Sequence, residues 1–100
     1  MTSLDFAENT IPTLPREISL LSNLEELRLN DCVLSRIPKS LCTLAKLRIL
    51  ELKNNHLQTL PEELKQLTGL CILHVEGNGI QSVPRYDSMK NLDDCDVDIV

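Results

Sequence analysis

Apolar residues return at fixed places along this chain with a period of 23 residues. Each period follows the pattern LxxLxLxxNxLxxLPxxLxxLxx; we call one period a unit and number its positions from 1. The units begin at Met1, Leu24, Leu47 and Leu70. A regular apolar repeat of this length predicts a solenoid, in which each unit buries its leucines against the neighbouring units. We expect one domain, 1–100, made of units 1–23, 24–46, 47–69 and 70–91 and a partial fifth unit 92–100.

The first half of each unit has the pattern of a short strand. In the second unit, Leu27 and Leu29 alternate with polar residues, which predicts a strand with one buried face. Parallel strands of successive units then place equal positions side by side. The fold class expected is an α/β solenoid, an arc with a concave parallel sheet of about five short strands and short helical or 3₁₀ turns on the convex side.

The second half of each unit predicts those turns. Apolar residues three apart follow a Leu-Pro step in 60–67, which favours one or two helical or 3₁₀ turns with proline at the first position. Between strand and turn, position 9 carries an asparagine in three units, and its amide can bond backbone groups that the bend leaves unpaired. Cys32 takes this place in the second unit, where a thiol replaces the amide only in part.

The fourth unit departs from the pattern near its end. Asp87 stands where position 18 requires an apolar residue, and the apolar residues around it recur one place early. A one-residue deletion accounts for this shift and makes 92–98 a fifth strand, with Asp94 at position 3 and Asp96 at position 5. The alternative is a solvated acidic tail, because this segment is rich in aspartate and no convex segment follows it.

These motifs resemble the leucine-rich repeat family over essentially the whole chain. The 23-residue length and the proline step at Pro15, Pro38, Pro61 and Pro84 are similar to the intracellular class found in Ras-suppressor and Scribble/Erbin-type scaffold proteins. The resemblance implies an arc that binds partner proteins mostly on its concave side, and it implies no enzyme.

Composition narrows the function further. A net charge of −5 and the presence of only Phe6 and Tyr86 as aromatic residues argue against nucleic acid and anionic membranes as partners. The start of the chain has no signal-peptide pattern, and no stretch is apolar enough for membrane insertion, so we expect a cytoplasmic protein. The four cysteines fall at different positions without metal-ligand spacing, which predicts reduced thiols and no metal or cofactor.

Positions 3, 5 and 7 point away from the leucines and form columns across the predicted sheet. They supply the candidate protein-binding residues, which are Glu26, Arg28, Ile49, Glu51, Lys53, Ile72, His74, Glu76, Asp94 and Asp96. Arg28 is expected to lie between Asp5 and Glu51, in a column of alternating charge that pairs across strands.

Two features of this surface indicate binding, and each has a second explanation. Ile49 and Ile72 form an apolar pair facing solvent, which fits a partner's apolar side chain but also the strand preference of β-branched residues. The acidic residues of 92–98 fit a basic partner, but charge on an edge strand also discourages aggregation.

The first hypothesis is therefore a non-catalytic interaction module in intracellular signalling or scaffolding, which binds a protein partner on the concave sheet. The alternative is a structural or regulatory fragment that assembles through uncapped apolar ends with another repeat domain, including end-to-end self-association. An enzyme is not expected, because Cys71 and His74 lie on an open strand with no oxyanion donor nearby.

Overall fold

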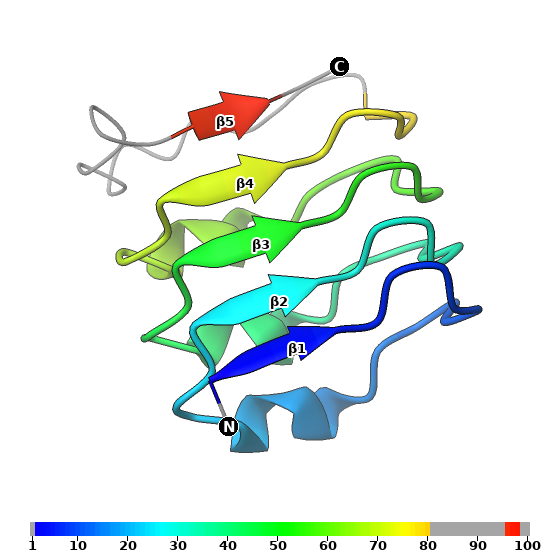
Figure 1. The fold of residues 1–100 in the computed structure, drawn as a ribbon. Coiled ribbons are helices and arrows are strands. Elements are labelled where there is room, and N and C mark those ends of the chain that lie inside the picture. Colours follow the sequence, from blue (N-terminus) through cyan, green and yellow to red (C-terminus); the bar gives the residue numbers. More distant parts are fainter. Residues whose placement is uncertain (1, 81–95, 99–100) are drawn as a thin grey trace.

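The computed structural model describes residues 2–80 and 96–98. Five short strands form one parallel sheet in the order β1-β2-β3-β4-β5, and 3₁₀ helices lie on its other side (Figure 1). The strands are β1 (Ser3–Asp5), β2 (Glu26–Arg28), β3 (Ile49–Glu51), β4 (Ile72–His74) and β5 (Asp96–Asp98). The helices are η1 (Arg16–Leu20), η2 (Lys39–Thr43) and η3 (Glu62–Gln66). The predicted α/β solenoid arc of the repeat type is confirmed.

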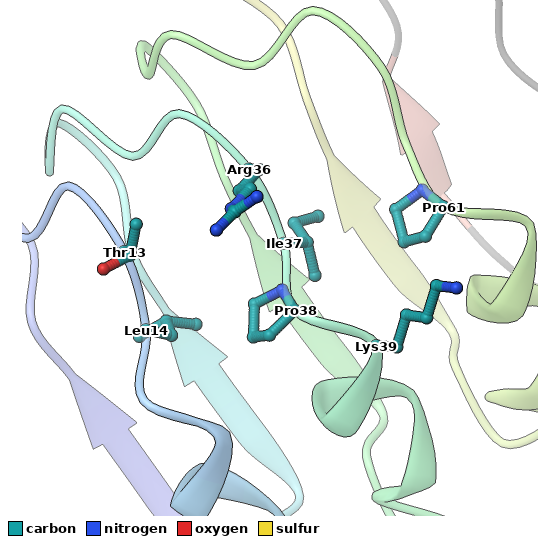
Figure 2. Close-up of a pocket in the computed structure, with 7 residues that line it drawn as sticks. All are labelled: Thr13, Leu14, Arg36, Ile37, Pro38, Lys39 and Pro61. Carbon is teal, nitrogen blue, oxygen red and sulfur yellow. The ribbon is translucent and has the colours of Figure 1, made fainter.

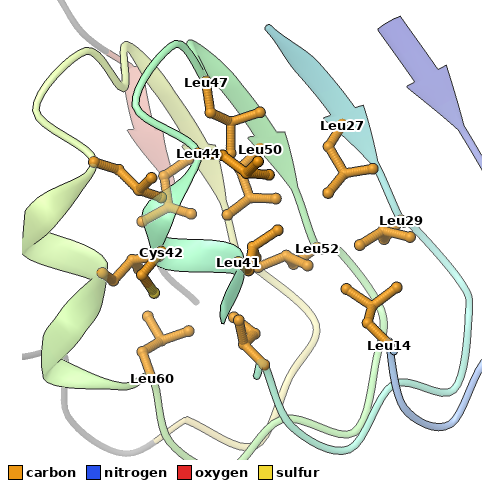
Figure 3. Close-up of a cluster of buried hydrophobic side chains, with 14 of the residues drawn as sticks. Leu14, Leu27, Leu29, Leu41, Cys42, Leu44, Leu47, Leu50, Leu52 and Leu60 are labelled. Carbon is orange, nitrogen blue, oxygen red and sulfur yellow. The ribbon is translucent and has the colours of Figure 1, made fainter. Parts of the chain in front are cut away.

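The first four strands pair position for position, as the repeat predicts. Leu4 is the register partner of Leu27, Leu27 of Leu50, and Leu50 of Leu73. Leu27 and Leu50 have no exposed surface, and together with leucines from the convex segments they form one continuous core (Figure 3). Successive units thus bury their apolar positions against each other, which is the source of stability in a solenoid.

The fifth strand is present, but its register differs from the prediction. Asp96, not Asp94, is the partner of Ile72, and Val97 is the partner of Leu73. The one-residue deletion is therefore wrong for this strand, which lies two residues later than expected. Apolar residues alternate through 95–99, and a slip of two residues keeps that alternation on the same face, so the pattern could not fix the register. Asp94 lies outside the described residues.

Each 3₁₀ helix begins directly after a proline. Pro15, Pro38 and Pro61 have extended backbones with φ of −68°, −70° and −68°, so they precede the first helical residue instead of occupying it as predicted. The fixed φ of proline still aims the chain into the turn, and its missing N–H removes a donor that would have no partner there. None of the helices in residues 2–80 has the length and apolar character needed to cross a bilayer.

Asn55 binds two neighbouring units together through its buried amide. Its Oδ1 accepts hydrogen bonds from the backbone N–H groups of Cys32 and Leu34 at 2.9 and 3.0 Å. Its Nδ2 donates to the carbonyl oxygens of Leu29, Leu52 and Lys53 at 2.8, 3.0 and 3.1 Å. Every hydrogen-bonding site of this amide is used, which is how a polar side chain with 5% exposure is tolerated in the core.

Cys32 reproduces only the donor half of this arrangement, as predicted. Its Sγ lies 3.0 Å from the carbonyl oxygen of Phe6, but it offers no amide oxygen to the preceding unit. The N–H of Ile11 bonds instead to the backbone carbonyl of Cys32 at 2.8 Å, whereas Leu34 uses the side-chain oxygen of Asn55. The turn of the second unit is therefore built differently from that of the third.

The same turn contains a strained residue. Position 8 is left-handed in all four turns, at Glu8, Asp31, Asn54 and Gly77. Val33 is also left-handed, with φ of 61°, and no other residue at its position in the described chain has a positive φ. A β-branched side chain in this region crowds its own backbone, so the turn around Cys32 stores conformational strain.

Replacing Val33 with glycine is expected to raise the free energy of unfolding. Relief of the left-handed strain outweighs the extra freedom of glycine in the unfolded chain, for a net gain of about 0.5–1 kcal/mol. Because Val33 is 45% exposed, less apolar burial is lost than at a core position. Urea denaturation followed by circular dichroism measures the change, and a lower midpoint than wild type would show that Val33 is not strained.

Candidate protein-binding surface

The outward face of the sheet consists of the side chains at positions 3, 5 and 7 in strands β1 to β4 and the residues after them. In β2, β3 and β4 the middle leucine is buried and the residues on either side are half-buried. Glu26, Arg28, Ile49, Glu51, Ile72 and His74 thus lie on the predicted side of the sheet. Asp96 joins the sheet as the register partner of Ile72, not of His74 as predicted.

Ile49 and Ile72 lie side by side on this face. They are register partners in adjacent strands, and each is half-buried. The neighbours in the same column are Glu26, the partner of Ile49, and Asp96, the partner of Ile72. An apolar pair is therefore bordered on both sides by acidic positions.

Arg28 organises the polar part of the face. Its Nη1 lies 2.8 Å from Glu26 Oε1 and its Nε lies 3.0 Å from Glu51 Oε2. The hydrogen bond that Arg28 donates to Glu26 is the main reason that the pKa of Arg28 is raised, and the negative charge of Glu51 adds to it. The column of Asp5, Arg28 and Glu51 is in register as predicted, but the second partner of the guanidinium is Glu26 of its own strand.

The network continues beyond Arg28. Asn30 donates from Nδ2 to Glu51 Oε1 at 2.8 Å and accepts at Oδ1 from the backbone N–H of Lys53 at 2.9 Å. Lys53 Nζ lies 2.9 Å from Glu76 Oε1. Both cations of the outward face in residues 2–80 are thus held by carboxylates of that face. Since the face also carries Asp5, whose carboxylate accepts the N–H of Ala7, carboxylates exceed cations on this surface.

The sequence pattern did not reveal the pairing of Glu26 with Arg28 or the two roles of Asn30. Residues two apart on a strand point to the same side, so the spacing of Glu26 and Arg28 contained the signal for the first of these. The hydrogen bonds of Asn30 depend on the exact offset between neighbouring strands, and the presence of a polar residue on the outward face does not indicate that offset.

The described thiols differ in their surroundings. Cys42 is buried among leucines (Figure 3), and desolvation, with a contribution from the charge of Glu63, raises the pKa of its thiol to about 11. Such a thiol stays protonated at neutral pH and is a poor nucleophile. Cys71 is half-buried and directly precedes strand β4.

Comparison with known proteins agrees with this architecture. A family model described as leucine rich repeat matches residues 22–80. The chain belongs to the leucine-rich repeat family. Proteins of this family generally act as protein-interaction modules, and the fold is typically a non-enzymatic scaffold. No curated protein matched the chain.

Two solved structures of leucine-rich repeat type are similar to the whole chain. A leucine-rich repeat protein of Leptospira interrogans is 40% identical, with a TM-score of 0.84 over 99% of this chain. An internalin, InlF, of Listeria monocytogenes is 20% identical, with a TM-score of 0.74 over 98% of this chain, and shows likeness of fold alone. The chain spans 25% and 34% of the lengths of these two solved chains.

Proposed function

We propose that this leucine-rich repeat domain is a non-catalytic module that binds a protein partner on the outward face of its sheet. The observation that supports the proposal is the register pairing of Ile49 with Ile72, half-exposed between acidic positions. Apolar side chains of this kind, surrounded by polar residues, are typical of the energetically important centre of an interface.

The surrounding charges define the partner's chemistry. Because Arg28 and Lys53 are already paired within the face, the charge left for recognition is negative. A partner segment that places an aliphatic or aromatic side chain on the isoleucine pair and a lysine or arginine beside it is complementary in both respects. The 23-residue period with its proline step supports a cytoplasmic role in scaffolding or signalling, as the resemblance to intracellular members of the family implies.

A double substitution, Ile49→Asp with Ile72→Asp, is expected to abolish partner binding while the domain stays folded. Loss of two central apolar contacts weakens such an interface by at least about 30-fold. The test is an affinity capture from cytosolic extract with the wild-type domain and the variant, followed by titration of each captured protein against both. Circular dichroism verifies the fold.

The chain offers a matched control variant for this experiment. Leu20 and Val33 are exposed apolar residues outside the outward face, so Leu20→Asp with Val33→Asp adds the same charge elsewhere. Partners lost only by the Ile49→Asp, Ile72→Asp variant support the proposal. If the Ile49→Asp, Ile72→Asp variant bound the same partners as tightly as wild type, the proposal would be refuted.

The alternative function, assembly through the apolar ends, draws support from the first unit. Leu4, Phe6 and Ile11 pack against the core but are only partly buried, and Leu20 is 76% exposed. Loss of capture or of self-association in the Leu20→Asp, Val33→Asp variant alone would favour assembly over the outward face. Light scattering during gel filtration measures self-association directly.

A further inference from the structure

A shallow groove of about 450 Å³ lies beside the proline steps, away from the outward face of the sheet (Figure 2). The segments that enter the 3₁₀ helices of the first three units form its walls. It is lined by Thr13, Leu14, Arg36, Ile37, Pro38, Lys39 and Pro61. Figure 2 shows Ile37 and Pro38 in the middle, with Thr13 and Leu14 on one side, Pro61 on the other, Arg36 above and Lys39 below.

The charge of this groove is opposite to that of the chain as a whole. Its charged lining residues are Arg36 and Lys39, and no carboxylate lines it, although the chain carries a net charge of −5. Within residues 2–80, Arg36 forms no ion pair. Lys39 lies 3.7 Å from Glu63 and is largely exposed, so this contact is weak and easily exchanged.

The proline residues of the groove offer a ligand no free backbone hydrogen-bonding group. The prolines have no N–H, and the carbonyl oxygens of Pro38 and Pro61 accept hydrogen bonds from Leu41 and Leu64 at 3.1 Å each. The charged groups that line the apolar floor are the guanidinium of Arg36 and the ammonium of Lys39. A guanidinium in this setting prefers a carboxylate, with which it can form two parallel hydrogen bonds.

We propose that this groove docks an acidic segment of a partner protein, with an aliphatic side chain over Ile37 and Pro38 and a carboxylate on Arg36. Charge complementarity favours this occupant, since two cations flank an apolar floor that no carboxylate lines. The proposal is independent of the proposed function, because the outward face is acidic and selects the opposite charge in its partner.

The test is a titration of the isotope-labelled 100-residue chain with a synthetic peptide, followed by nuclear magnetic resonance. The probe is the capped peptide Gly-Asp-Asp-Leu-Pro-Asp-Asp-Gly, and its counterpart has asparagine in place of every aspartate. Saturable shifts are expected at the backbone amides of Thr13, Arg36, Ile37 and Lys39. An Arg36→Glu, Lys39→Glu variant should bind the acidic peptide at least about tenfold more weakly.

Two controls separate the groove from general electrostatic attraction. Arg16→Glu with Lys46→Glu makes the same change of charge on exposed residues that do not line the groove, and it should leave the affinity within a factor of about two. The Ile49→Asp, Ile72→Asp variant should also bind the peptide as wild type does. The proposal would be overturned if the asparagine peptide or inorganic phosphate bound as tightly as the acidic peptide. It would also be overturned if the control variant lost as much affinity as the Arg36→Glu, Lys39→Glu variant, or if no saturable shifts appeared in the millimolar range.

Discussion

Replacing Asn55 with alanine is expected to lower the free energy of unfolding by about 4 kcal/mol, because several buried backbone groups lose their partners at once. The substitution leaves the N–H groups of Cys32 and Leu34 and the carbonyl of Leu29 without the amide that links them to the third unit. A loss of this size is a large part of the stability of a 100-residue domain. Urea denaturation by circular dichroism measures it.

The same position in the first unit supplies the control. Asn9 is exposed, and within residues 2–80 its side chain bonds only to the carbonyl oxygens of Phe6 and Ala7 of its own turn, at 2.8 and 3.3 Å. Asn9→Ala should therefore cost less than about 1 kcal/mol. If the two substitutions lowered the free energy of unfolding equally, the hydrogen bonds of Asn55 to the neighbouring unit would contribute nothing to stability.

Leu50→Ala is expected to destabilise the domain by about 3–4 kcal/mol, the range for a leucine removed from a closed core. Leu50 lies in the central strand β3 between Leu27 and Leu73, and none of its surface is exposed. Both neighbouring units hold its surroundings in place, so the cavity cannot collapse easily. The midpoint of urea denaturation should fall sharply, with a shallower slope if the two halves separate.

Leu4→Ala makes the same chemical change at the same position of the repeat, in the edge strand β1. Leu4 is only half-buried and has a neighbour on one side, so the expected cost is about 1 kcal/mol. If Leu4→Ala were as costly as Leu50→Ala, stability would not depend on contacts with units on both sides, and the solenoid account would fail.

Much of the fold could be predicted because one rule repeats. The period alone predicts that Leu27, Leu50 and Leu73 are in register, and the proline steps predict the turns that follow Pro38 and Pro61. Each of these predictions rests on several units at once, so an irregularity in one unit does not disturb it.

The features that were not predicted each depend on a single residue in one unit, so the repeat carries no signal for them. The register of β5 was missed because Val97 and its alternate neighbours fit two registers equally well. The left-handed backbone of Val33 could not be predicted, because a β-branched residue rarely adopts this conformation. The groove could not be predicted, because Arg36 occupies a position where other units carry threonine or serine, and only the folded chain places it in one groove with Pro61.

The predicted candidate surface was placed on the correct side of the sheet, but its chemistry was not. The side of each strand follows from the period of two, whereas the pairing of Arg28 with Glu26 depends on rotamers. That pairing changes the interpretation of the surface, because it removes Arg28 as a free cation and leaves the isoleucine pair as its distinguishing feature.

Because the register is constant from β1 to β4, the outward face of the sheet is a series of equally spaced, equivalent steps. Equal positions face each other at every junction, so a tandem copy of residues 47–69 would present to its neighbours the same leucines that they already contact. Each such copy would lengthen the surface by about 4.8 Å, the spacing of parallel strands, without moving any existing contact. The reach of this protein toward a partner can therefore be adjusted in fixed steps, and the chemistry of each step is set by three outward side chains.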